Sequence, residues 1–502
     1  MVASLFLVFS LAFIAAWALG LLSRRGHGGN LPPGPRPLPI VGNIFQLRGN
    51  PLKSLADLAK TYGPLMSLRF GTQLVVVVSS PEVAMEVLHK QGHTFSSRSL
   101  PAAVNIYGFN KALWTMMPAD SAPWKRFRKM GKEKLFSNEA LHQTEWQRQE
   151  ALQRLAKHVR GFSERGEVMN VGAATFTTMT DLVLSTLFSI HLTDYTSPDS
   201  AMTKEFKENV NAFSRYIGIP NVSDFFPILA PLDLQGIRRK IGHHLKKLLD
   251  FVDDKVDKRK LERMDSDYRK KNDFLDTLLD LADGAEYELT KEEISLLLAD
   301  LIIAGSETSG AMVEWTMVEL LLHPDKMAKV KAELKSVLGD KSIAEASDIA
   351  KLPYLQATVN EAFRYHPPSP LVGPREAREE TKVNGYTIPK KTRVLVNFWA
   401  ITKDPRIWKN PEVFEPERFL GTDIDFEGQH FQLIPFGSGI RICPGLPLAS
   451  RMLFCMVATL CHNFDWELPG GVESKVIERE DVFGLSLQKK VSLRAKPKPI
   501  KV

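Results

Sequence analysis

A ten-residue stretch near the C-terminus constrains the fold of this chain more than any other segment. Residues 436–445 read Phe-Gly-Ser-Gly-Ile-Arg-Ile-Cys-Pro-Gly, and an apolar run that is typical of a helix follows. Glycines at 437 and 439 permit backbone with positive φ, so the chain can pass close beneath a flat ligand. The start of the helix would direct amide groups and its positive dipole end at Cys443. Because this setting favours the thiolate, the form that binds metal, it predicts Cys443 as the axial ligand of a haem iron.

An ordinary buried cysteine is the alternative interpretation of Cys443. Five positions, however, fit the pattern Phe-x-x-Gly-x-Arg-x-Cys-x-Gly, beginning at Phe436. A chain of this length matches that pattern by chance on the order of once in ten thousand. A dinucleotide-binding loop is excluded, because Ile442 stands where its third glycine is required. We therefore favour the haem ligand, with Arg441 as a cation for a haem propionate.

These residues resemble the cysteine loop of the cytochrome P-450 superfamily, the haem-thiolate monooxygenases. The resemblance covers almost the whole chain, and it implies a mainly helical fold with a smaller β region. It implies haem b (iron protoporphyrin IX) as the cofactor and NADPH as an indirect source of electrons. The implied partner is NADPH-cytochrome P-450 reductase, with cytochrome b5 as a second candidate. No segment resembles a nucleic-acid-binding module.

The first forty residues predict attachment to a membrane. Residues 2–22 carry no charge and are long enough to cross a bilayer core of about 30 Å. A signal peptide is the alternative, because Ala16-Trp-Ala18 is similar to a cleavage site. Against it, the basic residues Arg24 and Arg25 follow the apolar run and none precedes it, which places the following chain in the cytoplasm.

The predicted organisation is therefore a transmembrane anchor at residues 1–22, a basic and proline-rich hinge at 23–39, and one catalytic domain at 40–502. The protein would be a single-pass protein of the endoplasmic reticulum membrane, with its catalytic domain on the cytoplasmic side. Three cysteines in 502 residues argue against a disulfide framework and agree with a reducing compartment.

A basic surface and a set of arginines provide candidate contacts with a partner and with haem. The net charge of +7 suits anionic lipid or an acidic partner. One basic segment comprises Lys125, Arg126, Lys129, Lys132 and Lys134. The resemblance implies that this segment docks the reductase. The alternative interpretation is an ordinary solvated face. The resemblance also makes propionate ligands of Trp124 and Arg128, which share one helix face. An aromatic ring packed on an arginine is the alternative for this pair. Arg375 joins Arg441 at the propionates, and Arg98 is a further candidate.

A long buried helix is predicted from Thr290 to His323. Thr290 and Glu293 fit a capping box, and the apolar run behind them continues to the residue before Pro324. Near its middle, Ala304 and Gly305 are small enough to leave room beside a ligand, and an acid, Glu307, adjoins Thr308. A threonine bonded back to its own helix is the alternative. The resemblance makes this the oxygen-binding motif, in which Thr308 and Glu307 organise proton delivery; Glu307 replaces the more frequent aspartate.

Two further sets of residues complete the predicted site. Glu361, Arg364 and Arg418 are expected to form a hydrogen-bonded triad that stiffens the core, since bidentate arginine-carboxylate pairs fix geometry. The substrate pocket is expected to be mostly apolar, although plain core packing is the alternative for each side chain. Its predicted wall comprises Ile106, Phe109, Leu113, Phe213, Leu371, Val372, Phe483 and Leu485.

The motifs together predict a monooxygenase that hydroxylates an apolar terpenoid with O2. The sequence of residues 220–229 and 233–236 resembles the plant branch of the family that oxidises terpenoids. This resemblance favours an abietane-type diterpene as substrate over a monoterpene alcohol such as geraniol. A haem-thiolate isomerase or dehydratase acting on fatty hydroperoxides can dispense with Glu307 and Thr308. A non-catalytic membrane scaffold or haem carrier leaves the small residues at 304 and 305 unexplained.

Overall fold

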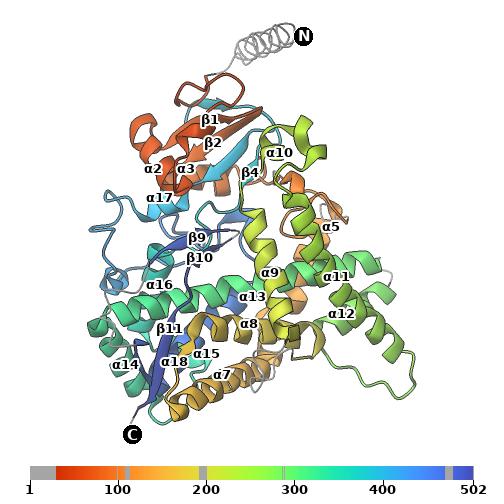
Figure 1. Cartoon of the computed structure of the whole chain (residues 1–502), viewed down its shortest axis with the longest axis vertical. Coiled ribbons are helices and arrows are strands. Elements are labelled where there is room, and N and C mark those ends of the chain that lie inside the picture. Colours follow the sequence, from red (N-terminus) through yellow and green to blue (C-terminus); the bar gives the residue numbers. More distant parts are fainter. Residues whose placement is uncertain are drawn as a thin grey trace, which may run out of the picture.

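The structure is a computed structural model of the chain, and helices dominate it, with a smaller proportion of sheet, as the sequence predicts (Figure 1). It describes residues 30–98, 100–107, 113–191, 201–284, 287, 289–469, 479–484 and 486–500.

The N-terminal part of the described chain forms a helix and an antiparallel strand pair. Helix α2 (Pro51–Tyr62) is capped by Asn50, whose side chain accepts hydrogen bonds from two backbone amides of the first turn. Strands β1 (Leu65–Phe70) and β2 (Gln73–Val78) then form an antiparallel pair. Ser80 caps the next helix, α3 (Pro81–Met85), which continues as a wider turn over Glu86–Lys90.

The sheet region is assembled from segments that lie far apart in the sequence. Strand β2 pairs in parallel with β7 (Arg393–Val396), and β7 pairs with β4 (Arg375–Glu376), so the main sheet has the order β1-β2-β7-β4. The sequence predicts only its N-terminal half, because a parallel pair joining residues about 300 apart leaves no local signal. The smaller sheets are β5 (Thr381–Val383) with β6 (Tyr386–Ile388), β9 (Asp481–Phe483) with β10 (Leu487–Lys489), and β3 (Met169–Asn170) with β11 (Arg494–Pro499) and β8 (Phe464–Glu467).

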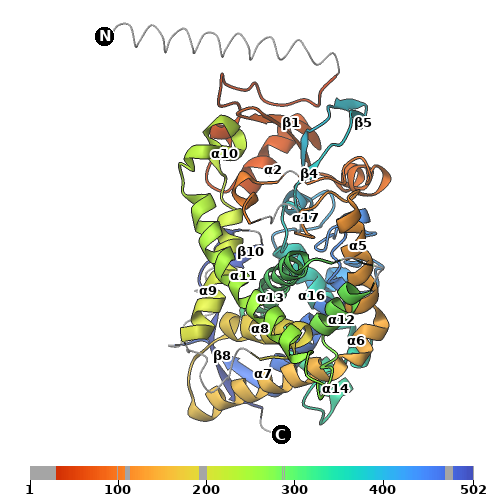
Figure 2. The ribbon, with the colours of Figure 1, turned by 90° about the vertical axis from the view of Figure 1, so that its right-hand side faces the viewer.

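One long helix, α13 (Lys291–Leu322), runs through the middle of the molecule; it is seen from the side in Figure 1 and nearly end-on in Figure 2, and both views place other helices around it. Its capping box joins Thr290 and Glu293, as predicted from the sequence. The other helices are α5 (Ala122–Met130), α6 (Asn138–Gln143), α7 (Glu145–Arg165), α8 (Val171–Phe188), α9 (Ala201–Ile217), α10 (Val222–Phe225), α11 (Ile237–Glu262), α12 (Phe274–Asp283), α14 (Pro324–Leu338), α15 (Ala346–Ile349), α16 (Pro353–Tyr365), α17 (Phe398–Thr402) and α18 (Leu446–Asn463).

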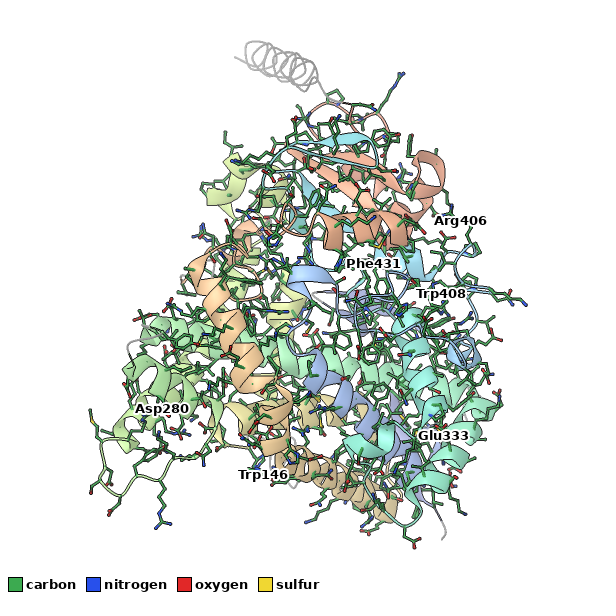
Figure 3. The ribbon with its side chains drawn as sticks, turned by 180° about the vertical axis from the view of Figure 1, so that it is seen from behind. Trp146, Asp280, Glu333, Arg406, Trp408 and Phe431 are labelled. Atoms are coloured by element: carbon green, nitrogen blue, oxygen red, sulfur yellow. The ribbon has the colours of Figure 1, made fainter. Side chains whose placement is uncertain are left out.

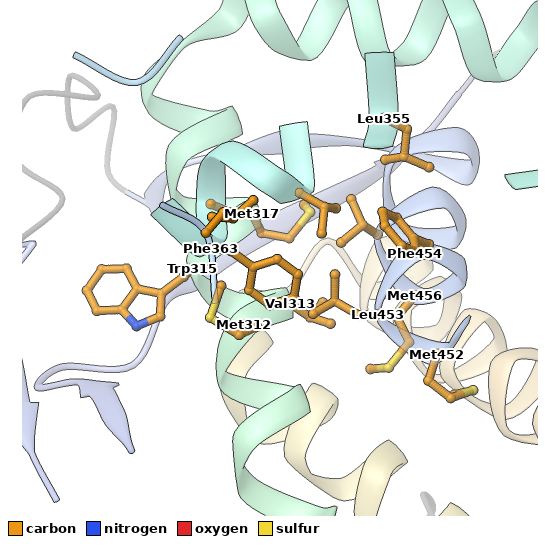
Figure 4. Packing of buried hydrophobic residues seen from close by; sticks show 14 of the residues in the cluster. Met312, Val313, Trp315, Met317, Leu355, Phe363, Met452, Leu453, Phe454 and Met456 are labelled. Carbon is orange, nitrogen blue, oxygen red and sulfur yellow. The ribbon is translucent and has the colours of Figure 1, made fainter. Parts of the chain in front are cut away.

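The largest apolar core joins α13, α16 and α18, the helices that support the predicted site. Figure 4 shows Phe363 of α16 between α13 and Leu453 and Met456 of α18, and Trp315 and Met317 of α13 belong to the same cluster. All five side chains are almost completely excluded from solvent. This packing fixes the helix that follows Cys443 against the helix that carries Thr308.

Two helices among the described residues are long and apolar enough to span a membrane, α8 and α13. Most of each is buried by the rest of the fold, 78% of the apolar window in α8 and 72% in α13, as befits core helices. The predicted anchor at residues 1–22 lies outside the described residues, as do residues 23–29 of the predicted hinge.

The described end of the proline-rich segment is fastened to strand β1. The carbonyl groups of Pro32 and Pro33 accept hydrogen bonds from the hydroxyl and amide of Ser67, at 2.7 and 2.8 Å. A Cβ on Gly34 would come within 3.0 Å of the Ser67 carbonyl, so the two backbones are in direct contact. Residues 32–35 therefore pack on the sheet rather than forming a free spacer.

Candidate active site

The loop before α18 folds back on itself and presents Cys443 at the start of that helix. The Cys443 amide donates to the Phe436 carbonyl at 2.9 Å, which closes the loop, and α18 begins at Leu446. The backbone amides of Gly445 and Leu446 donate to the Cys443 sulfur. This is the arrangement that the sequence predicts for holding a thiolate at a helix N-terminus.

Burial nevertheless raises the pKa of the Cys443 thiol above its usual value. The two amides and the positive charge of Arg128 act in the opposite direction but are the smaller effects. A coordinated metal cation deprotonates a thiol outright. The backbone amides that the sequence predicts around Cys443 are therefore present, but they do not outweigh burial. Metal binding would supply the rest of the stabilisation that the thiolate needs.

Both glycines of this loop have the predicted backbone conformation, and Gly439 is also needed for packing. Gly437 and Gly439 both have positive φ, 71° and 68°. A Cβ at Gly439 would come within 3.0 Å of the Leu88 carbonyl, in the turn that follows α3. The expectation of a close approach to a ligand is corrected at Gly439, because another backbone segment occupies that side of the residue.

Three arginines that the sequence assigns to the propionates come together near the loop. Arg375 and Arg441 are buried and Arg98 is half-buried. Burial lowers the pKa of Arg98 to about 10, and burial together with the charges of Arg98 and Arg128 lowers the pKa of Arg441 to about 9. Burial, with the charges of Arg98 and Arg441, also brings the pKa of Arg375 well below its usual value.

This arginine cluster (Arg98, Arg375 and Arg441) has no carboxylate partner among the described residues. The Nε atoms of Arg98 and Arg375 are buried and have no hydrogen-bond partner in the same part of the chain. Since buried charges require partners, the cluster fits a ligand that carries carboxylates, as haem b does through its two propionates.

Helix α5 adds the predicted aromatic residue to the same place. The Trp124 ring is buried, and the guanidinium groups of Arg441 and Arg128 lie 5.4 and 6.0 Å from its centroid. The Trp124 ring therefore packs on arginine, which is the alternative interpretation made from the sequence. This packing is compatible with a propionate contact, because the ring also adjoins Arg441 of the arginine cluster.

One face of α13 remains partly exposed although the helix lies in the middle of the molecule. The partly exposed positions are spaced by three and four residues, as expected for a single helix face; they are Leu301, Ala304, Gly305, Thr308 and Ala311. We infer that packing leaves space along this face for a ligand. A Cβ at Gly305 would nonetheless contact Val183 of α8 at 2.9 Å, so this glycine is also needed for helix packing.

The two predicted catalytic residues, Thr308 and Glu307, have different surroundings. The Thr308 hydroxyl donates to the Ala304 carbonyl at 2.9 Å, which is the alternative considered from sequence. Glu307 is buried, and its Oε1 accepts hydrogen bonds from Ser486, at 2.5 Å, and from Gln488. Burial raises the pKa of Glu307. The sequence offered no signal for Ser486 and Gln488, because they lie about 180 residues from Glu307.

The predicted triad of Glu361, Arg364 and Arg418 is assembled in the core. Arg364 donates to both carboxylate oxygens of Glu361, at 2.7 and 2.8 Å, and Arg418 donates to Oε1 at 3.1 Å. Figure 3 shows two side chains near α16 that support this helix, Glu333 and Trp408. Glu333 accepts two amide hydrogen bonds at the start of α16, and Trp408 lies 5.7 Å from the Arg364 guanidinium.

The predicted pocket residues fall into three groups. Leu113, Phe213 and Val372 are buried, while Ile106 and Leu371 are half-buried beside the core. Val372 has a φ of 49°, a strained conformation for a β-branched residue, and its Cγ1 adjoins Gly437 of the cysteine loop. Residues Phe109 and Leu485 and the side chain of Phe483 lie outside the described part of the structure.

The basic segment on α5 and the turn after it is largely exposed. Lys125, Lys129, Lys132 and Lys134 are exposed. Arg126 differs from the prediction, because it forms an ion pair with Glu293 of α13 at 2.6 Å. It therefore ties two helices together instead of extending the basic surface.

Comparison with known proteins identifies the family. The family model for cytochrome P-450 matches residues 32–493. A carnosic acid synthase of Rosmarinus officinalis is 70% identical over 501 residues, covering 98% of this chain and 99% of that protein. An 11-hydroxysugiol 20-monooxygenase of Salvia miltiorrhiza is 60% identical, covering 98% and 99%. A ferruginol synthase of Isodon rubescens is 46% identical, covering 96% and 97%. With nearly its whole length matched and its cysteine loop in place, the chain belongs to the cytochrome P-450 family, whose members use haem iron and receive NADPH electrons through a reductase.

Proposed function

We propose that this monooxygenase hydroxylates an abietane-type diterpene. The observation that carries the proposal is the 70% identity, over almost the full length of both chains, to a protein named carnosic acid synthase. Relatives at 60% and 46% identity are named for 11-hydroxysugiol and ferruginol, which belong to the same abietane class. A monoterpene alcohol such as geraniol remains the second candidate from sequence, but none of these names supports it.

The position of attack can be proposed from the same relatives. The protein at 60% identity is named a 20-monooxygenase, so the first product to seek carries its new oxygen at position 20. In a single hydroxylation, one atom of O2 enters a C–H bond and the other leaves as water. Two electrons from NADPH, delivered by the reductase, and two protons complete that balance.

Different residues are proposed to hold the haem and to deliver protons. Bound haem would supply the iron chemistry that activates O2. Cys443 is proposed to hold the iron, and Trp124, Arg128 and the arginine cluster to hold the propionates. Thr308 and Glu307 are proposed to deliver protons. Phe436 supports Cys443, since its carbonyl closes the loop and its ring packs on Phe363 at 5.4 Å between centroids.

The substrate is proposed to bind beside the partly exposed face of α13. Leu371 and Val372 are proposed to line that space, and the contact of Val372 with Gly437 of the cysteine loop supports this. Ile106, Leu113 and Phe213 pack on a neighbouring apolar core. An apolar wall of this kind suits a fused hydrocarbon ring system.

Membrane attachment and partner docking complete the proposal. Residues 1–22 are proposed to anchor the protein in the endoplasmic reticulum membrane, with residues 23–39 leading to a catalytic domain at 40–502. The exposed lysines at 125, 129, 132 and 134 are proposed to bind the acidic face of the reductase, and cytochrome b5 is a second candidate for that surface.

Turnover in microsomes under labelled oxygen tests the proposed function. The full chain is co-expressed with a plant reductase and supplied with NADPH and a panel of monoterpene, sesquiterpene and abietane substrates. Mass spectrometry should find one labelled oxygen atom in an abietane product for each round of hydroxylation. Labelled geraniol derivatives without a labelled abietane would favour the second candidate. No labelled terpenoid, from protein with a normal carbon monoxide spectrum, would contradict the substrate class.

A further inference from the structure

Glu307 lies where three segments meet, in addition to its place beside Thr308. It belongs to α13, Ser214 of α9 acts to lower the pKa of its carboxyl, and its Oε1 accepts from Ser486 and Gln488 at the C-terminal β9–β10 hairpin. Ser214 and Ser486 are both buried. The buried carboxyl of Glu307 thus lies in contact with two segments from other parts of the chain.

The two segments also touch each other directly. A Cβ on Gly218, just after α9, would come within 3.0 Å of the Gly484 backbone. A Cβ on Gly484 would meet the Ser214 carbonyl at 3.2 Å. The hairpin and the end of α9 are therefore in backbone contact, and a displacement of either one would move the donors around Glu307.

The two oxygens of Glu307 have different surroundings. Oε1 accepts from Ser486 and Gln488, whereas Oε2 is buried and has no hydrogen-bond partner among the described residues. Donors on Oε1 occupy the lone pairs of that atom, so a carboxyl proton would reside on Oε2. Burial, by raising the pKa of Glu307, favours the protonated form.

We propose that Ser486 and Gln488 are positioning residues for proton delivery: they hold Oε1 of Glu307 and leave Oε2 as the atom that carries and releases the proton. The fit of a substrate against the β9–β10 hairpin would thereby affect how completely O2 consumption is coupled to product. The inference rests on the proposed role of Glu307 in the function above. Neither Ser486 nor Gln488 needs to touch the substrate.

The same helix provides a matched control two turns further along. Glu314 also accepts from the C-terminal segment, with Oε1 bonded to the Ser492 hydroxyl at 2.8 Å and to the Leu493 amide at 2.6 Å. Unlike Glu307, Glu314 faces the positive charges of Lys489 and Lys207. Ser492→Ala removes a similar serine-glutamate bond without altering Glu307.

The test compares the double variant Ser486→Ala/Gln488→Met with Ser492→Ala, Ser486→Thr and the unaltered protein. Infrared spectroscopy of the resting haem protein, without turnover, identifies the carboxylic acid band of Glu307 as the one lost in Glu307→Gln. In the double variant this band should shift to higher wavenumber, because the carbonyl loses its donors. Product formed per NADPH should fall by about threefold or more, the scale of a lost hydrogen bond. Ser486→Thr, which keeps a hydroxyl donor, should leave both values as in the unaltered protein, and Ser492→Ala should change neither.

Each outcome separates this inference from the proposed function. An unshifted band, the absence of any Glu307-dependent band, or an equal effect of Ser492→Ala would overturn the positioning role. If Glu307→Gln lowers coupling while the double variant does not, the role of Glu307 stands and the positioning role fails. If no abietane turns over but the band shifts, the hydrogen bonds stand and the substrate assignment fails.

Discussion

Thr308 and Glu307 are adjacent residues with different hydrogen-bond partners. Thr308 is half-buried and bonds to its own helix, whereas Glu307 is buried and bonds to a distant segment. A hydroxyl held only by a backbone carbonyl can rotate to donate elsewhere, since it also has lone pairs to accept with. In the proposed mechanism, Glu307 would hold the proton and the Thr308 hydroxyl would pass it on.

Thr308→Ala should retain substrate binding but release reducing equivalents as hydrogen peroxide. The variant loses the hydroxyl but little volume, so the pocket remains while the proton path is interrupted. Peroxide formed per NADPH should rise severalfold relative to the unaltered protein, and the substrate-induced change in the haem spectrum should persist. Thr316→Ala, whose hydroxyl bonds to Met312 at 2.7 Å in the same helix, is the control. Full coupling in Thr308→Ala would remove this residue from proton delivery.

The carboxylate of Glu361 is the buried counter-charge of Arg364 and also accepts from Arg418. Glu361→Gln should destabilise the protein by about 3–5 kcal/mol, because the buried Arg364 would lose its counter-charge. Chemical denaturation of the haem protein measures the loss. Glu415→Gln is the control, since Glu415 is 45% exposed and pairs with Arg418 at 3.4 Å. A surface pair of that kind contributes less than about 1 kcal/mol. Equal losses in the two variants would contradict the role of the buried pair.

At the scale of an element, the cysteine loop depends on its contact with the turn after α3. Gly439→Ala should destabilise the haem protein by about 2–5 kcal/mol, combining left-handed backbone strain with a clash against Leu88. Gly385→Ala isolates the strain alone, because Gly385 has a φ of 81° and open space around it. Its expected cost is about 1–2 kcal/mol. Denaturation and the yield of haem-loaded protein measure both. A Gly439→Ala variant no less stable than Gly385→Ala would show that the contact with Leu88 is dispensable.

The bounds of elements were predictable wherever the signal was local. The capping box at Thr290 and the proline after His323 bracket α13 within a residue or two, because both signals lie within one turn of the helix end. The partners of Glu307 were not predictable, since Ser486 and Gln488 meet it only through the folding of the C-terminal hairpin.

Within the candidate site, too, local contacts could be predicted from the sequence and long-range contacts could not. Trp124 and Arg128 share a helix face and could be paired from spacing alone. The meeting of Arg98, Arg375 and Arg441 without a carboxylate partner among the described residues could not be predicted from spacing, because the three come from distant parts of the sequence. Gly439 shows the limit most clearly: its positive φ was expected, but the segment that requires it, at Leu88, was not.

At the scale of the whole molecule, the basic surface on α5 should govern electron supply. Lys125→Glu/Lys132→Glu/Lys134→Glu should raise the reductase concentration needed for half-maximal turnover about tenfold at low salt, with a smaller effect at high salt, because screening weakens surface charge. Titration of reductase at two ionic strengths measures this. Lys258→Glu/Lys260→Glu, which reverses exposed lysines on α11, should have little effect. An equal effect of both variants would indicate net charge rather than a docking surface.

The central claim is that Cys443 holds a haem iron in this family member. The measurement that tests it most directly is the carbon monoxide difference spectrum of the reduced full-length protein in microsomes. The unaltered protein should give the red-shifted band of a thiolate-ligated haem, and Cys455→Ala, altered at a buried cysteine of α18, should retain it. Cys443→Ala should lose the band while the protein remains detectable by immunoblot. An unchanged band in Cys443→Ala would contradict the account.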